Sequence, residues 1–121
     1  MNHASGFIKL VDDAKTRIKE ISAEEVLANL QKSVPFLLVD TREESEFATG
    51  RIPGSVHLSK GIIECYIESK VPDKNTPMVL YCGGGYRSAL AADALQKMGY
   101  TNVLSMAGGW RGWNERGFPT E

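Results

Sequence analysis

Hydrophobic side chains occur along the chain in two alternating patterns. Continuous apolar runs at 36–40 and 78–81 are typical of strands buried on both faces of a parallel sheet. Short stretches at 19–21, 56–58 and 102–105, each with at least one apolar residue, predict three further strands. Between the strands, apolar positions at helical spacing predict helices at 6–19, 22–30, 43–48, 62–67 and 88–98 and a short helix near the end of the chain.

Local signals mark where several of these helices begin and end. Ser22-Ala23-Glu24-Glu25 matches a capping box at the start of the second helix. Gly50 and Gly99 follow helical stretches at the position where glycine commonly ends a helix. Strands that alternate with helices predict a parallel α/β fold, and such folds place ligands at the carboxyl ends of their strands.

Composition narrows the class of protein. The 121 residues fit a single domain, and a net charge of −1 with a pI near 6.1 leaves no basic excess for nucleic acid. The apolar runs are too short to span a membrane, and no secretory signal is visible at 1–15. Two cysteines and two histidines provide neither a disulfide framework nor a structural metal site. We therefore expect a reduced cytoplasmic protein without metal or cofactor, in which Cys65 packs in or near the interior.

Cys82 is the residue most informative about chemistry. It directly follows a buried strand, and the glycines of Gly83-Gly84-Gly85 come next, before a helix that begins near Arg87-Ser88. Glycines let successive backbone N–H groups converge on one point, and a helix N-terminus adds positive potential. These groups and Arg87 favour an anion, either the thiolate of Cys82 or an anionic substrate held against it.

Several chemistries use a loop of this general kind. Dinucleotide binding is disfavoured because the third glycine of G-x-G-x-x-G is missing and no acid follows the next strand. A phosphate-binding P-loop is excluded because no Gly-Lys-Ser/Thr is present. Cysteine phosphatases place five residues between cysteine and arginine, whereas only four separate Cys82 from Arg87. A phosphatase or arsenate reductase remains an alternative, as does sulfur transfer.

The chain resembles the rhodanese family of sulfurtransferases from about residue 21 to residue 119. Four motifs carry the resemblance, in family order: Val39-Asp40-Thr41-Arg42 with Glu46-Phe47; Gly50-Arg51-Ile52-Pro53-Gly54-Ser55; Tyr81-Cys82-Gly83-Gly84-Gly85-Tyr86-Arg87-Ser88; and Gly108-Gly109-Trp110-Arg111-Gly112-Trp113. The second motif departs from the family in having Arg51 for histidine and Ser55 for alanine. Residues 1–20 fall outside the resemblance and are predicted to form an extra helix ahead of a rhodanese-like domain at 21–121.

The resemblance implies a three-layer sandwich, with a five-stranded parallel sheet and helices on both faces. It also implies a sulfurtransferase that moves a sulfane sulfur from thiosulfate or a related donor, through a persulfide on Cys82, to cyanide or a thiol. The expected partners are therefore a small anionic sulfur donor and a thiophilic acceptor, with a sulfur-relay protein as a further candidate and no nucleic acid or membrane. The substrate-binding residues that it implies are Gly83, Gly84, Gly85, Tyr86, Arg87 and Ser88.

Other motif residues are expected to support the fold. Asp40, Arg42 and Glu46 are predicted to form an ion-pair cluster that fixes the loop after the first long strand. Trp110 and Trp113 are predicted to lie mainly in the core. A module that carries persulfide for a partner without catalysing turnover stays an alternative to the enzyme, because the same loop serves both functions.

Overall fold

A five-stranded parallel sheet lies at the centre of the molecule. The computed structural model describes residues 3–121, and its strand order is β1-β5-β4-β2-β3 with every neighbouring pair parallel. The expected sheet is confirmed, including its weakly patterned first and third strands. The strands are β1 (Lys19–Ile21), β2 (Leu37–Asp40), β3 (Val56–His57), β4 (Met78–Tyr81) and β5 (Val103–Met106).

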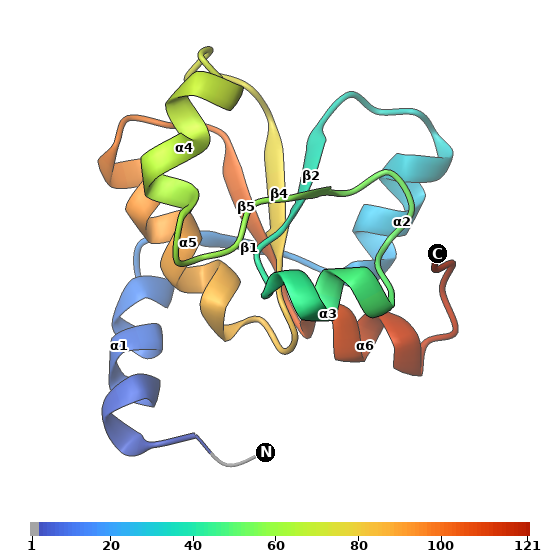
Figure 1. The fold of residues 1–121 in the computed structure, drawn as a ribbon, viewed down its shortest axis with the longest axis horizontal. Coiled ribbons are helices and arrows are strands. Elements are labelled where there is room, and N and C mark those ends of the chain that lie inside the picture. The colour runs from blue at the N-terminus through green and yellow to red at the C-terminus, as the bar shows by residue number, and fades with distance from the viewer. Residues whose placement is uncertain (1–2) are drawn as a thin grey trace.

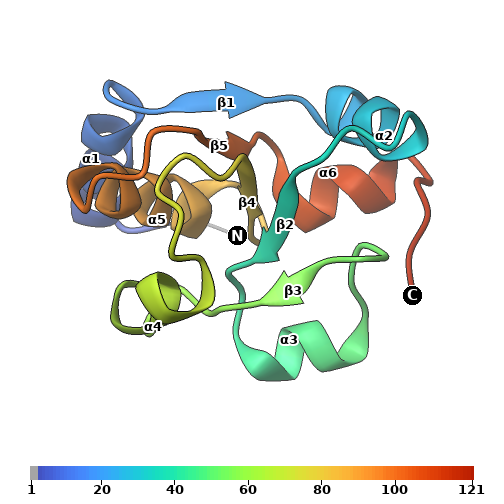
Figure 2. The same cartoon turned by 90° about the horizontal axis from the view of Figure 1, so that it is seen from above.

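Helices cover both faces of this sheet. Figure 2 shows α4 and α5 on one side of the strands and α2 and α6 on the other, while α1 lies beside α5 and α3 lies near β3 (Figures 1 and 2). The expected three-layer sandwich is therefore confirmed. The helices are α1 (Ser5–Lys15), α2 (Ala23–Gln31), α3 (Glu44–Thr49), α4 (Ile63–Lys70), α5 (Tyr86–Lys97) and α6 (Gly109–Glu115).

The two layers of core follow from side-chain alternation along the central strands. Successive side chains of a strand point to opposite faces of the sheet. Val39 and Leu80 pack among the residues of α4 and α5, whereas Leu38, Val79 and Tyr81 pack with α2 and α6. Because both faces are covered, β2 and β4 carry the continuous apolar runs that predicted them.

The first helix is shorter than its apolar pattern predicted. It ends at Lys15 instead of continuing to Lys19, and Lys19 already belongs to β1. Val11 is buried against the domain, while Leu10 is 57% exposed. Arg17, just after the helix, donates two hydrogen bonds of 2.9 Å to Asp93 on α5, and these bonds hold the pKa of Asp93 below its ordinary value. This contact fixes the end of α1 to α5.

Other boundaries differ from expectation by one to three residues. The most important is the start of α5, at Tyr86 instead of Ser88, with Gly85 as its N-cap at φ 98°. Ser22 caps α2 as expected, by accepting a hydrogen bond from the Glu25 N–H at 3.1 Å. Within residues 3–121, no helix combines the length and the apolar character needed to cross a bilayer.

Candidate active site

Cys82 lies where the central strand β4 ends. Hydrogen-bonded neighbours flank β4 on both sides, β2 and β5, so the residue after Tyr81 emerges at the middle of the carboxyl edge of the sheet. Cys82 is 1% exposed and yet lines a cavity that opens on this edge. The fold therefore presents one sulfur atom at the floor of a pocket.

The loop after Cys82 turns back toward its sulfur. The Gly85 N–H donates to Cys82 Sγ at 3.1 Å, and Gly85 then takes a φ of 98°, which glycine adopts readily, where the loop turns into α5. Ser88 Oγ lies 3.5 Å from the same sulfur and 2.8 Å from Ser105 Oγ on β5. The side chains of Cys82, Ser88 and Ser105 are all buried. A short row of polar side chains therefore extends from the sulfur into the interior.

The start of α6 holds the loop from outside. The N–H groups of Trp110 and Arg111 donate to the carbonyls of Cys82 and Gly83 at 2.7 and 3.0 Å. Gly109 lies so close that a Cβ atom there would collide with the Cys82 carbonyl oxygen, and its φ of 55° is left-handed. A residue without a side chain is therefore needed at Gly109, because the backbone of α6 and the backbone of the cysteine loop are in direct contact there.

Arg87 forms an ion pair with Glu46 at the edge of the cavity. Its guanidinium donates to both carboxylate oxygens, at 2.8 and 3.2 Å, and the two side chains are 31% and 38% exposed. The hydrogen bonds from Arg87 hold the pKa of Glu46 below its ordinary value, and Glu46 in turn raises the pKa of Arg87. The carboxylate therefore offsets the charge of the arginine in the loop.

The expected cluster of Asp40, Arg42 and Glu46 is divided in the structure. Arg42 binds Asp40 in the interior, with the closest contact at 2.7 Å, and donates to the Gly50 carbonyl at 2.6 Å. Glu46 binds Arg87 instead, because α3 carries it to the cavity side. The prediction of a single cluster was therefore wrong for Glu46, although Asp40 and Arg42 do fix the segment after β2.

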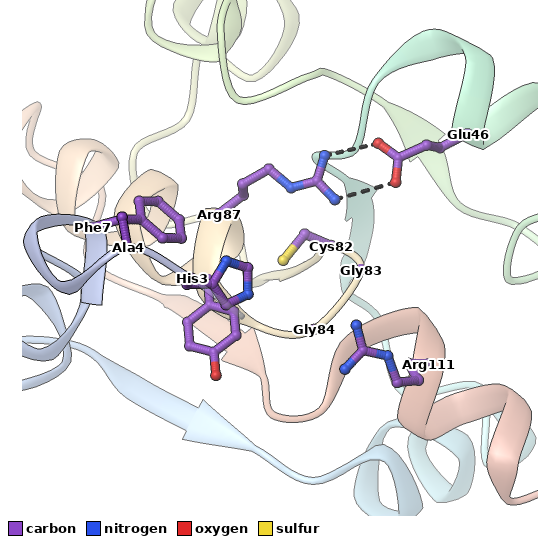
Figure 3. Close-up of a pocket in the computed structure, with 10 residues that line it drawn as sticks. His3, Ala4, Phe7, Glu46, Cys82, Gly83, Gly84, Arg87 and Arg111 are labelled. Atoms are coloured by element: carbon purple, nitrogen blue, oxygen red, sulfur yellow. Dashed lines mark hydrogen bonds and ion pairs between the residues drawn. The ribbon is translucent and has the colours of Figure 1, made fainter. Parts of the chain in front are cut away.

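The cavity that Cys82 lines has a volume of about 660 Å³, and Figure 3 shows the residues around it. Of the predicted catalytic and substrate-binding residues, Gly85 and Ser88 do not line it, whereas the others do: Cys82, Gly83, Gly84, Tyr86 and Arg87. The supporting residue Glu46 lines it as well. Figure 3 shows Arg87 with Glu46 on one side of Cys82 and Arg111 on another. Four further lining residues were not expected from the sequence: His3, Ala4, Phe7 and Arg111.

Comparison with known proteins decides the family. The model of the rhodanese-like domain matches residues 22–116. The chain belongs to the rhodanese-like domain family. A sulfurtransferase of Allochromatium vinosum is 35% identical over 84% of this chain and 94% of its own length. Thiosulfate sulfurtransferase GlpE of Haemophilus influenzae is 30% identical over 85% of this chain and 94% of its own. These relatives support a sulfurtransferase activity in general.

A solved structure covers the N-terminal helix as well. It belongs to a Rhodopseudomonas palustris protein of unknown function, described as a possible tyrosine phosphatase. The TM-score is 0.86 at 30% identity, over 100% of this chain and 98% of the other. The whole chain, including α1, therefore has a counterpart of the same fold.

Ahead of the rhodanese-like domain, α1 and the two residues that precede it supply one wall of the pocket. The rings of His3 and Phe7 lie 4.4 and 6.1 Å from that of Tyr86, and the Lys15 ammonium lies 5.6 Å from its centre. Neither His3 nor Phe7 belongs to a family motif, so only the packing of α1 on α5 reveals their place.

The remaining sequence predictions have mixed outcomes. Trp113 is buried in the core as expected, and Trp110 is half-buried with the Arg42 guanidinium 4.7 Å from its ring centre. Cys65 was expected to pack in or near the interior, and that was wrong: it is exposed. The apolar spacing that predicted α4 buries Ile63 and Ile67, and Cys65 lies on the other side of the helix.

Proposed function

We propose that this rhodanese-like domain moves a sulfane sulfur through a persulfide on Cys82. In the first half, the Cys82 thiolate attacks the outer sulfur of thiosulfate, the S–S bond of the donor breaks, and sulfite leaves with the bonding electron pair. The product is a persulfide anion on Cys82, so charge and sulfur both balance.

In the second half, a thiophilic acceptor attacks the terminal sulfur of the persulfide. The Cys82–sulfur bond breaks and its electron pair returns to Cys82 as thiolate, while the acceptor leaves as a thiocyanate or a persulfide. No proton transfer to a separate base is needed, because Cys82 enters and leaves the cycle as an anion.

The observation that carries the proposal is the placement of Cys82 Sγ. It lies on the cavity floor with the Gly85 N–H directed at it and Ser88 Oγ beside it. A hydrogen bond to an anionic sulfur is charge-assisted and stronger than one to a neutral group. The other loop residues, Gly83, Gly84, Tyr86 and Arg87, form the cavity wall that faces the donor.

The names of the relatives support this proposal. The A. vinosum relative is called a sulfurtransferase, and the H. influenzae relative is called a thiosulfate sulfurtransferase. Thiosulfate is accordingly the first donor to test, and cyanide and small thiols are the first acceptors.

Intact-mass measurement after incubation with thiosulfate tests the proposal. The wild-type protein should gain the mass of one sulfur atom and lose it on addition of cyanide or dithiothreitol. Cys82→Ser should form neither the adduct nor thiocyanate. Cys65→Ser is the matched control, because it removes the exposed thiol and should keep full activity. An adduct that depends on Cys65, or none at all, would overturn the proposal.

A phosphatase is the second candidate, suggested by the description of the R. palustris protein. Two features disfavour it. Only four residues separate Cys82 from Arg87, and the Arg87 guanidinium is bound to Glu46. Hydrolysis of an aryl phosphate by wild-type protein, lost in Cys82→Ser, would favour this candidate, especially if thiosulfate left no adduct.

A further inference from the structure

The positive charges that line the pocket outnumber the negative ones. Three ionised side chains line it: Arg87, Glu46 and Arg111. Glu46 binds Arg87 through both carboxylate oxygens. Within residues 3–121, Arg111 forms neither an ion pair nor a side-chain hydrogen bond. Arg111 therefore contributes the uncompensated positive charge of the lining.

The backbone of Arg111 is fixed although its side chain is exposed. Its N–H donates to the Gly83 carbonyl at 3.0 Å, which ties the residue to the cysteine loop. A guanidinium nitrogen lies 3.9 Å from the position that a Cβ would take on Gly84. Figure 3 shows this guanidinium beside Gly84, on a different side of Cys82 from Arg87.

We infer that Arg111 is the residue that binds the anionic end of the incoming sulfur donor. A guanidinium presents several N–H donors in a plane, which suits the oxygens of a sulfonate or carboxylate. Arg87 has already committed two N–H groups to Glu46, so its role is to hold Glu46 and the loop together. This inference rests on the proposed function for the identity of the donor, but the charge preference that it predicts can be measured without sulfur transfer.

The reactivity of Cys82 toward two alkylating reagents tests the inference. Iodoacetate is an anion and iodoacetamide is neutral, while both react with the same thiolate. The experiment uses the full chain with Cys65→Ser, so that Cys82 is the only thiol. Arg111→Gln should slow iodoacetate about fivefold at low ionic strength and leave iodoacetamide within about twofold. Added salt should reduce the difference, because the charge is exposed.

Two matched variants complete the design. Arg111→Lys keeps the charge and should retain most of the preference for iodoacetate. Arg116 follows α6 directly, and its guanidinium binds Glu24 at 3.1 Å, outside the pocket. Arg116→Gln should therefore change the rate of neither reagent. Equal slowing of both reagents by Arg111→Gln would show an effect on the sulfur itself and overturn the inference, as would no change in either rate.

Steady-state kinetics then connect the result to the proposed function. With dithiothreitol as a neutral acceptor, Arg111→Gln should raise the KM for thiosulfate about fivefold with little change in kcat. If wild-type protein transfers no sulfur but the alkylation preference depends on Arg111, the proposed function fails and the anion site stands. If sulfur transfer occurs and the preference does not depend on Arg111, the inference fails alone.

Discussion

Two of the arginine–carboxylate pairs, Asp40 with Arg42 and Glu46 with Arg87, differ in burial and therefore in what they contribute. Asp40 and Arg42 are 0% and 3% exposed, and they join the end of β2 to the Gly50 carbonyl. Glu46 and Arg87 are about one-third exposed, and they face the cavity. A buried pair is costly to break, because the remaining charge has no water to solvate it, whereas an exposed pair contributes little to stability. The first pair therefore belongs to the fold and the second to the site.

The largest expected effect concerns the buried pair. Arg42→Gln leaves Asp40 buried without its cation, and should lower the free energy of unfolding by about 3–5 kcal/mol. Urea denaturation at pH 7 measures this loss. The double variant Asp40→Asn with Arg42→Gln removes both charges and should lose less than the single one. If Arg42→Gln cost no more than Glu46→Gln, the contrast between the two pairs would not hold.

Loss of the exposed pair is expected to have a smaller effect, which concerns donor binding and not the stability of the fold. Glu46→Gln removes the charge that offsets Arg87, so the net positive charge of the pocket lining increases by one. The KM for thiosulfate should fall about threefold, while the free energy of unfolding changes by less than about 1 kcal/mol. Steady-state kinetics and urea denaturation measure the two quantities. A lower kcat at unchanged KM would mean that Glu46 acts by positioning Arg87.

The smallest effect is the pH dependence of the Glu46–Arg87 pair. The hydrogen bonds from Arg87 hold the folded-state pKa of Glu46 below its ordinary value near 4.5. The stabilisation is therefore present above the ordinary pKa and is lost as the pH falls through the lowered one. The difference in unfolding free energy between wild type and Glu46→Gln, below about 1 kcal/mol at pH 7, should shrink as the pH falls below the ordinary pKa and vanish below the lowered one. A difference that grew on acidification would contradict this assignment.

The sequence predicted what depends on local pattern. The apolar runs of β2 and β4 and the glycines after Cys82 predict that this cysteine lies at the carboxyl edge of a parallel sheet, and the structure places it there. The start of α5 was predicted two residues too late, because Gly85, which has no capping side chain, precedes the helix. Patterns of this kind concern residues a few positions apart, so they determine elements and loops well.

Features that depend on distant packing were not visible in the sequence. Glu46 and Arg87 are 41 residues apart, and nothing in either motif indicates that α3 brings them together. Phe7 enters the pocket only because α1 packs on α5, and Arg111 does so because the α6 backbone bonds to Gly83. The apolar pattern of α4 fixes which side of the helix is buried, but a small residue such as Cys65 fits either side.

The bonds from α6 to the cysteine loop also bear on the order in which the protein matures during synthesis. Cys82 leaves the ribosome well before Gly109. The carbonyls of Cys82 and Gly83 therefore form their hydrogen bonds with the N–H groups of Trp110 and Arg111 only after α6 has emerged. A nascent chain that has reached only β5 already carries Cys82, but the loop around it still lacks these bonds. The loop on which the proposed sulfur transfer depends is in this sense completed late, by a segment that contributes no reacting atom.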